Sequence, residues 1–495
     1  MIRKTAFAAA LALITSLSAL PLSAQGHDER AARAEANEQR TAAMGEAFAL
    51  AGIWLEAQRE YNAIPALSVA VVKGQDTVWA EGFGYTDRAQ TKPATPDTIY
   101  SICSISKLFT SVALMQQWER GEVRLDEPVT SYLPWATLQP DERDSVPVTM
   151  RGLLTHSAGL PRESRHGYWS GSHTFPTQAE IRAEIGAQSP LFPASREWQY
   201  SNLGLTLVGE TVEAVSGEPY ADYVTSNIIT PLGLENTQPV MQADKYGQQM
   251  AVGWGSRGRD GTRPEIAIFD ARGIAPAAGY SSTVNDLANF AKWQLRLLKD
   301  ETPELLRAST LREMQRVQYI APDWDNSWGL GFAVWNQDGR NVAGHGGSCP
   351  GYRSSFMIDP GGDMAITVMM NTMDSPGALA RGIGALMQKR VGTSDLSGAE
   401  KVPDLAEFAG HYDSQPWANE FVIMPWAGGL VTLDLPTGDP ANDIGLMKPL
   451  GGDRFVALND KGRERDVIEF IRDEGGNVTA LRRFENTYPL VRPIE

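Results

Sequence analysis

The pattern of hydrophobic and polar positions divides this chain of 495 residues into regions of different character. Residues 28–60 are rich in Ala, Glu and Arg, which favours a helix. Residues 67–72 and 77–83 are rich in apolar and β-branched side chains and flank a polar turn that contains Gly74. This pattern predicts a β-hairpin.

The central region alternates less regularly, and residues 104–298 are expected to form mainly helices and loops. Three strand-like runs follow at residues 331–335, 354–358 and 364–370, and a helical pattern covers 376–391. Strands at both ends of a region with helices between them predict an α+β domain, in which one sheet is flanked by helices.

The pattern of hydrophobic and polar residues changes again after a stretch whose Gly, Ser and charged residues are typical of a linker. Short runs of alternating character then recur between Gly and Asp turns, at residues 421–424, 429–433, 466–471 and 478–484. Such spacing predicts a small all-β domain. We place the larger domain at residues 45–393, the linker at 394–402 and the small domain at 403–495.

The first 24 residues have the character of a secretory signal peptide. Arg3 and Lys4 precede an apolar stretch, residues 6–22, and small residues follow at Ser23 and Ala24. An uncleaved anchor is the alternative, although the apolar stretch is short for a membrane span. We expect a mature protein in the periplasm or outside the cell, with residues 25–44 as a helical extension.

The net charge of the chain disfavours some classes of binding partner. The chain has 44 basic and 60 acidic residues, a net charge of −16, which disfavours nucleic acid and anionic membrane surfaces. The six histidines show no metal-ligand spacing with Cys or carboxylate residues, so we expect neither a metal nor an organic cofactor.

The first candidate catalytic residues are Ser104 and Lys107, which are spaced S-x-x-K at the start of a helical pattern over residues 107–118. Residues i and i+3 share a helix face, so the lysine is expected beside the serine, which needs a base to act as a nucleophile. The helix N-terminus adds positive partial charge where an oxyanion would form. About two such spacings are expected by chance, and a capped helix with a solvated lysine is the alternative.

Two more motifs follow. Tyr200 and Asn202 stand in Y-x-N spacing, and His345-Gly346-Gly347-Ser348 lies further along. Taken singly, Tyr200 could be a packed aromatic residue, Asn202 a helix cap and His345 a strand-end histidine. None of these alternatives explains why the three motifs occur in this order.

The ordered motifs resemble the active-site serine penicillin-recognising family. That family includes class C β-lactamases, D-Ala-D-Ala carboxypeptidases, D-aminopeptidases and β-lactamase-like carboxylesterases. Four further segments also match the family, at residues 65–72, 153–161, 278–282 and 329–332. The resemblance therefore covers about residues 45–393. It implies a β-lactamase/transpeptidase-like fold, and the C-terminal region resembles the lipocalin-like β-barrel appended to many family members.

The resemblance also implies roles. Ser104 would be acylated, and Lys107 and Tyr200 would share the proton transfers, with the choice of base for acylation left open. Asn202 would bind the substrate amide and orient Lys107. His345 would face the substrate carboxylate or the Tyr200 hydroxyl from an edge strand.

The residues after His345 would shape the substrate cleft. Gly346 and Gly347 would leave room for the substrate, and the backbone N–H groups of Ser104 and Ser348 would form the oxyanion hole. His156 belongs to a family-like segment, and we interpret it as structural.

The two cysteines, Cys103 and Cys349, neighbour the two expected oxyanion donors. Our hypothesis is a disulfide across the floor of the site, similar to the cystine of class A carbapenem-hydrolysing β-lactamases. Two buried free thiols are the alternative.

The sequence therefore indicates an exported serine hydrolase that works through a seryl acyl-enzyme. Its expected substrates are D-amino-acid-containing peptides, including peptidoglycan fragments, and its expected mode is that of a peptidase or carboxypeptidase. A short-chain carboxylesterase and a class C-like β-lactamase are the alternatives. A non-catalytic cell-wall-binding protein is a more remote one.

Overall fold

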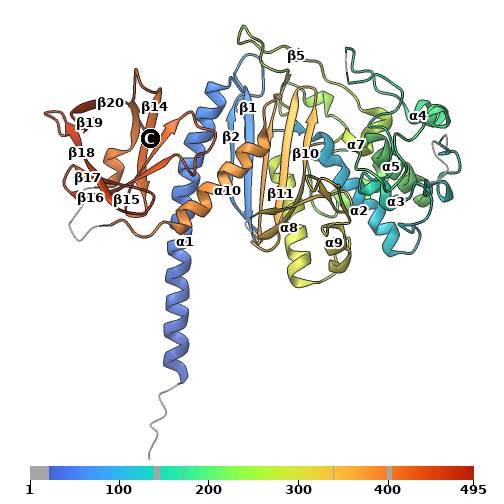
Figure 1. The fold of residues 1–495 in the computed structure, drawn as a ribbon, viewed down its shortest axis with the longest axis horizontal. Coiled ribbons are helices and arrows are strands. Elements are labelled where there is room, and N and C mark those ends of the chain that lie inside the picture. Colours follow the sequence, from blue (N-terminus) through green and yellow to red (C-terminus); the bar gives the residue numbers. More distant parts are fainter. Residues whose placement is uncertain (1–21, 139–144, 170, 338, 398–403, 495) are drawn as a thin grey trace, which may run out of the picture.

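The computed structural model describes residues 22–138, 145–169, 171–337, 339–397 and 404–494. A large domain of sheet and helices lies on one side and a closed β-barrel on the other, with helices α1 (Leu22–Tyr61) and α10 (Pro376–Gly392) between them (Figure 1). The predicted α+β domain and the C-terminal barrel are both confirmed.

The large domain is built on an eight-stranded sheet in the order β2-β1-β12-β11-β10-β9-β8-β7. Each pair of neighbours is antiparallel, and the predicted hairpin is β1 with β2. The strands are β1 (Ala66–Lys73), β2 (Asp76–Gly84), β7 (Tyr319–Ile320), β8 (Ser327–Trp328), β9 (Ala333–Gln337), β10 (Arg340–Cys349), β11 (Tyr352–Asp359) and β12 (Met364–Met370).

Strand β1 shows how the sheet separates two cores. Successive side chains of a strand point to opposite faces. Val69 and Val71 join a cluster with α1 and α10, whereas Ala70 and Val72 join the cluster that contains α2 (Ser106–Glu119) and α8 (Val284–Asp300). Burial on both faces explains the uninterrupted apolar run of this strand.

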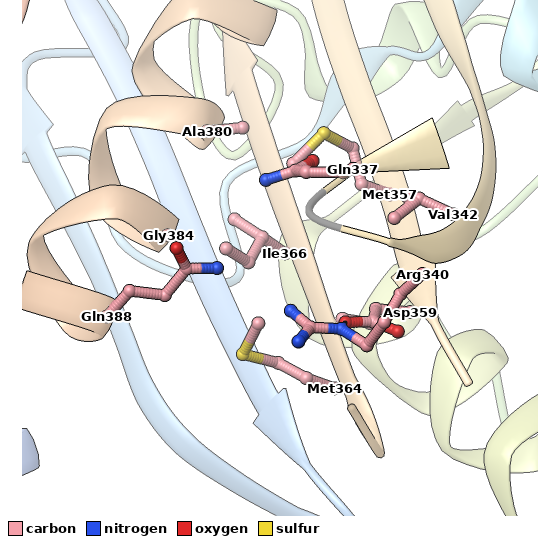
Figure 2. A pocket seen from close by; sticks show the side chains of 11 residues that line it. Gln337, Arg340, Val342, Met357, Asp359, Met364, Ile366, Ala380, Gly384 and Gln388 are labelled. Carbon is pink, nitrogen blue, oxygen red and sulfur yellow. Dashed lines mark hydrogen bonds and ion pairs between the residues drawn. The ribbon is translucent and has the colours of Figure 1, made fainter. Parts of the chain in front are cut away.

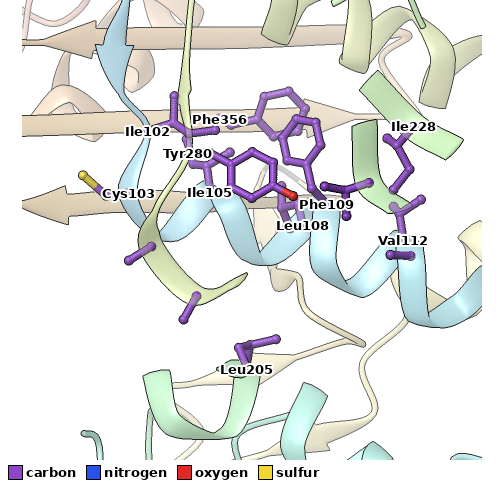
Figure 3. Close-up of a cluster of buried hydrophobic side chains, with 14 of the residues drawn as sticks. Ile102, Cys103, Ile105, Leu108, Phe109, Val112, Leu205, Ile228, Tyr280 and Phe356 are labelled. Atoms are coloured by element: carbon purple, nitrogen blue, oxygen red, sulfur yellow. The ribbon is translucent and has the colours of Figure 1, made fainter. Parts of the chain in front are cut away.

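The core around α2 supports the residues that come before it. Phe109 stacks on Tyr280 and Phe290, with ring centroids 5.1 and 4.5 Å apart, and Ile105 and Leu108 pack in the same cluster (Figure 3). This helix is buried along most of its length, so its first turn has a fixed position.

Shorter elements complete the helical side of the large domain. They are β3 (Tyr100–Ser101), α3 (Met150–Leu154), α4 (Gln178–Glu184), α5 (Asn202–Ser216), α6 (Tyr220–Val224), β4 (Gly253–Trp254), β5 (Glu265–Ile266), α7 (Ala275–Ala278), β6 (Ser281–Ser282) and α9 (Ala308–Met314). Helices α5 and α7 pack against α2 and against each other.

The barrel closes in sequence order, since each strand from β13 to β20 pairs antiparallel with the next and β20 returns to β13. Aromatic rings from Phe408, Tyr412, Phe421, Phe455 and Phe470 pack together in its core. The strands are β13 (Gly410–Asp413), β14 (Glu420–Trp426), β15 (Gly429–Leu435), β16 (Ile444–Gly451), β17 (Arg454–Leu458), β18 (Glu464–Arg472), β19 (Val478–Arg483) and β20 (Asn486–Pro493).

Helix α1 runs without a break across the boundary expected at residue 45. The predicted signal peptide lies outside the described residues apart from 22–24, which begin this helix, and residues 398–402 of the predicted linker also lie outside them. In the part of the chain that the structure describes, no helix combines the length and apolar character that crossing a membrane requires.

Helix α1 also bridges the two domains. Trp54 Nε1 donates to the Thr437 carbonyl at 2.9 Å, and the Glu46 carboxylate accepts from Arg390 at 2.5 Å and from the Ala427 N–H at 2.8 Å. These contacts join α1, α10 and the barrel into one packed unit.

A small cavity lies between α10 and the sheet, where Ala380 and Gly384 face Met357 and Ile366 (Figure 2). Its volume is about 30 Å³, and the Arg340–Asp359 ion pair (2.7 Å) closes one side. This space is large enough for about one water molecule, so we treat it as a packing gap rather than a substrate site.

Candidate active site

Ser104 lies in a tight turn between β3 and α2, formed by the 3₁₀ helix Cys103–Ile105. The residue is nearly buried, with 9% exposed. The Ile102 N–H donates to the Tyr280 carbonyl at 2.9 Å, and the Tyr280 N–H donates to Ser106 Oγ at 3.0 Å. The turn is thus held against the buried segment around β6, and Ser104 has a defined position.

Lys107 is fully buried beside Ser104, one helical turn along α2. Its Nζ lies 3.2 Å from Ser104 Oγ, 2.7 Å from Asn202 Oδ1 and 2.7 Å from the Ala277 carbonyl oxygen. Burial holds the pKa of the Lys107 amine well below its ordinary value, and the negative charge of Glu163 opposes this shift.

The three partners of Lys107 suit a neutral amine. The oxygens of Asn202 and Ala277 can only accept, so they take the two N–H groups of an NH₂. In that form the lone pair is directed at Ser104 Oγ, 3.2 Å away, in place of the N–H that an ammonium donates to it. Lys107 therefore contacts both the candidate nucleophile and the Asn202 amide.

Asn202 begins helix α5, and the preceding Ser201 caps that helix by accepting from the Gly204 N–H at 2.9 Å. Asn202 Nδ2 donates to Glu163 Oε1 at 2.6 Å, and the Tyr168 hydroxyl donates to the other oxygen of Glu163. Because a carboxylate only accepts, Glu163 fixes which end of the Asn202 amide faces the lysine.

Tyr200 lies between two basic side chains. Lys107 Nζ and the Arg162 guanidinium carbon are each 4.9 Å from the centre of its ring. Burial raises the pKa of Tyr200, while its hydrogen bond with Ser104 acts in the opposite direction. The phenol therefore keeps its proton at neutral pH and contacts the serine side chain.

Aromatic rings surround Tyr200. The ring centroid of His156 lies 4.4 Å from that of Tyr200, and Trp198 and Trp328 lie 6.2 Å from it. His156 Nδ1 accepts from the Ser201 N–H at 3.1 Å, so it positions the backbone after Tyr200. This agrees with the structural role that the sequence indicated for His156.

His345 projects from β10 towards the same rings, with its centroid 6.1 Å from Tyr200 and 5.5 Å from Trp328. Its Nδ1 lies 2.6 Å from the Gly346 carbonyl oxygen. Burial is the main cause that lowers the pKa of His345, to about 3. The imidazole is therefore neutral at pH 7.

Strand β10 lies inside the sheet, so the expectation that His345 stands on an edge strand is correct only locally. Its pairing with β11 covers residues 343–349, whereas its pairing with β9 covers only 340–344. The segment from His345 to Cys349 therefore has an edge that β9 does not cover, and a substrate backbone can lie along it.

Gly347 allows β10 to approach the serine turn. A Cβ at this position would lie 2.2 Å from the Ile102 carbonyl oxygen and 2.1 Å from Ser354 Oγ. At Gly346 the nearest atom to such a Cβ, the Ser354 carbonyl oxygen, is 3.8 Å away. Close approach of the two backbones thus requires glycine at 347 but not at 346.

A disulfide joins Cys103 to Cys349, with the Cα atoms 5.8 Å apart across a sequence separation of 246 residues. The alternative of two free thiols is therefore wrong. Ser104 and Ser348 each neighbour one half of this cystine, so their backbones lie close together beside the Ser104 side chain.

The structure brings together the side chains of Ser104, Lys107, Tyr200, Asn202 and His345, as the sequence predicted. Sequence reasoning missed Arg162, Glu163, Trp198 and Trp328. Arg162 and Glu163 directly follow the family-like segment 153–161, and that position was the available signal. Trp328 directly precedes the family-like segment 329–332, which was the available signal there.

Comparison with known proteins decides the family. Residues 54–388 match the sequence profile described as Beta-lactamase. The chain belongs to the beta-lactamase family. Members of this family are serine hydrolases, and solved structures among them include an amidohydrolase and a β-lactamase/D-alanine carboxypeptidase.

Relatives within the beta-lactamase family are distant. Penicillin-binding protein 4 of Amycolatopsis lactamdurans is 26% identical over 73% of this chain and 96% of its own length. Some other curated relatives are matched over only 54–60% of their length.

Solved structures confirm the fold. The octameric penicillin-binding protein homologue from Pyrococcus abyssi has 24% identity, a TM-score of 0.61, and coverage of 89% of this chain and 98% of its own. The D-amino acid amidase from Ochrobactrum anthropi SV3 has 23% identity, a TM-score of 0.56, and coverage of 69% and 96%.

Proposed function

We propose that this protein is an exported serine hydrolase that cleaves D-amino-acid-containing peptides and amides through an acyl-enzyme at Ser104. One observation carries the proposal: a buried amine with a depressed pKa and a protonated phenol both contact the Ser104 hydroxyl. That arrangement supplies a base and an acid at one nucleophile.

In the acylation step, Ser104 Oγ attacks the substrate carbonyl carbon while its proton passes to the lone pair of Lys107. The carbonyl oxygen becomes an oxyanion, which the backbone N–H groups of Ser104 and Ser348 stabilise. Lys107 is then an ammonium that can donate to all three of its neighbours, including the new ester oxygen of Ser104.

Collapse of this intermediate breaks the bond to the leaving amine, which needs a proton. Tyr200 supplies that proton and is reprotonated from Lys107, whose Nζ lies 4.9 Å from the phenol ring centre. Water then attacks the acyl carbon, Tyr200 relays its proton, and Ser104 leaves with its hydroxyl restored. The products are an amine and a carboxylic acid.

Support for a preference for D-amino-acid substrates comes from similar proteins. The D-stereospecific amidohydrolase from Streptomyces and the D-amino acid amidase from Ochrobactrum share this fold. The proposal of export depends on the N-terminal sequence pattern, and detection of the mature protein in the periplasmic or secreted fraction tests it.

The test is hydrolysis of D-alanine p-nitroanilide, with the L enantiomer as the matched control. We expect the D substrate to be at least about tenfold faster in kcat/KM, and Ser104→Ala to lower this value about 1000-fold or more. Near-normal turnover by the alanine variant contradicts the seryl mechanism. A preference for the L enantiomer contradicts the stereochemical part alone.

A further inference from the structure

The hydrogen-bonding state of His345 limits what this site can recognise. Its Nδ1 lies 2.6 Å from the carbonyl oxygen of Gly346. Because a carbonyl oxygen can only accept, Nδ1 must carry the hydrogen and donate it. In a neutral imidazole the other ring nitrogen, Nε2, is then a hydrogen-bond acceptor with a free lone pair.

That acceptor is buried and unused. The His345 residue is 6% exposed, and within the described part of the chain Nε2 has no hydrogen-bond partner. A buried polar atom without a partner costs free energy, so the site gains stability when a donor reaches it. The imidazole packs against the rings of Tyr200 and Trp328, beside the candidate nucleophile, where a bound substrate can supply a donor.

A neighbouring ring offers the complementary atom. Trp328 lies 5.5 Å from His345 between ring centroids, and its Nε1 is also buried without a partner among the described residues. An indole N–H only donates. Two adjacent rings thus present one unused acceptor and one unused donor, which match the N–H and C=O of an amide.

The surroundings do not offer a carboxylate a comparable place at this position. Lys107 directs its nitrogen to three partners, and Arg162 on the rim is ion-paired with Glu163 at 3.2 Å. Positions 346 and 347 are glycines and contribute no hydroxyl, and Ser348 lies on the opposite face of β10 from His345 by strand alternation.

We propose that the substrate group seated beside His345 is an uncharged hydrogen-bond donor, such as a carboxamide or a peptide N–H, rather than a free carboxylate. This deepens the proposed function and rests on it. It favours D-amino-acid amides and internal peptide bonds over peptides cut at a free C-terminus. The sequence had suggested either the substrate carboxylate or the Tyr200 hydroxyl as the group that His345 faces.

A matched pair of substrates tests the inference. N-acetyl-D-alanyl-D-alanine and its C-terminal carboxamide differ only in the group that this position would receive. We expect the purified full-length protein to cleave the carboxamide with a kcat/KM at least about tenfold higher, because the lone pair of Nε2 repels an anion and accepts from an N–H. An equal or higher value for the free acid overturns the inference.

Two variants assign the effect to His345. His345→Lys places a cation there and should move the ratio of the two kcat/KM values at least about tenfold towards the free acid. His345→Gln retains an uncharged acceptor and should keep the wild-type order. An unchanged ratio in a His345→Lys protein that still reacts at Ser104 with a fluorophosphonate overturns the inference.

The controls separate this inference from the proposed function. Cleavage of D-alanine p-nitroanilide without cleavage of either dipeptide refutes the inference and leaves the Ser104 mechanism standing. Failure of the anilide assay together with absence of fluorophosphonate reaction at Ser104 refutes the proposed function, and the inference with it.

Discussion

At the scale of single residues, the site works by opposite effects of burial on two groups. Burial lowers the pKa of the Lys107 amine and raises that of the Tyr200 phenol. The same apolar surroundings therefore favour a neutral amine and a neutral phenol beside Ser104, as the proposed base and acid require, since burial disfavours the charged form of each.

The pH dependence of kcat/KM tests this arrangement. A base must be unprotonated, so activity should rise with pH through the pKa of Lys107. The charge of Glu163 raises that pKa and the charge of Arg162 lowers it. Glu163→Gln should therefore move the rising part of the profile to lower pH, and Arg162→Gln should move it to higher pH. Movement of both profiles in the same direction contradicts Lys107 as the base.

The sequence predicted the catalytic residues better than their supports. Ser104, Lys107, Tyr200 and Asn202 stand in short motifs, because each pair shares one helix or one helix start. Glu163 reaches Asn202 from a separate loop, across 39 residues. No spacing rule connects such a pair, so only the folded chain reveals it.

At the scale of elements, the approach of β10 to the serine turn is the critical contact. Sequence reasoning assigned strands on either side of it but did not assign this strand as a whole. Four of its ten residues from Arg340 to Cys349 lie in the run Gly344-His345-Gly346-Gly347, which has low strand propensity. Strand β10 is stabilised by its pairing with β9 and β11 and by its disulfide, although its residues have low strand propensity.

Alanine substitutions at neighbouring glycines test this packing. Gly347→Ala should lower the free energy of unfolding by about 2 kcal/mol or more, because its Cβ would meet the Ile102 carbonyl oxygen at 2.2 Å. Gly346→Ala is the matched control, and it should change stability by less than about 1 kcal/mol, since its Cβ would make only an ordinary contact, 3.8 Å from the Ser354 carbonyl oxygen. Equal effects in denaturant unfolding would show that the two backbones are not in close contact.

The disulfide gives a second prediction for the same contact. It closes a loop of 246 residues, for which loop entropy gives about 5 kcal/mol, and measured effects are usually about 2–5 kcal/mol. The double variant Cys103→Ser, Cys349→Ser should therefore melt at a lower temperature. In the wild-type protein, alkylation under denaturing conditions without reductant should label neither cysteine. Two labelled cysteines contradict the bond.

At the scale of the whole molecule, helix α1 packs against both the barrel and the hydrolase domain and joins them. The sequence indicated two domains joined by a linker, because composition changes after residue 393. It did not show that one buried cluster extends from Val69 in the sheet through Trp54 and Ile383 to Val431 in the barrel. Such contacts between distant segments have no local signature.

Thermal unfolding should consequently show one cooperative transition for the full chain. Trp54→Phe removes the hydrogen bond to the Thr437 carbonyl and part of the ring that packs on Gly382. We expect a loss of about 1–3 kcal/mol that lowers the whole transition rather than part of it. Two separate calorimetric transitions, with only the barrel affected by the substitution, contradict a shared core.

Covalent labelling of Ser104 tests the proposed catalytic mechanism most directly. The full-length protein should react with a fluorophosphonate at one site, and peptide mapping by mass spectrometry should place the adduct on the peptide that contains Ser104. Lys107→Ala should slow this reaction by about 100-fold or more, since the serine loses its base. An adduct on another residue, or an unchanged rate in the lysine variant, contradicts the mechanism.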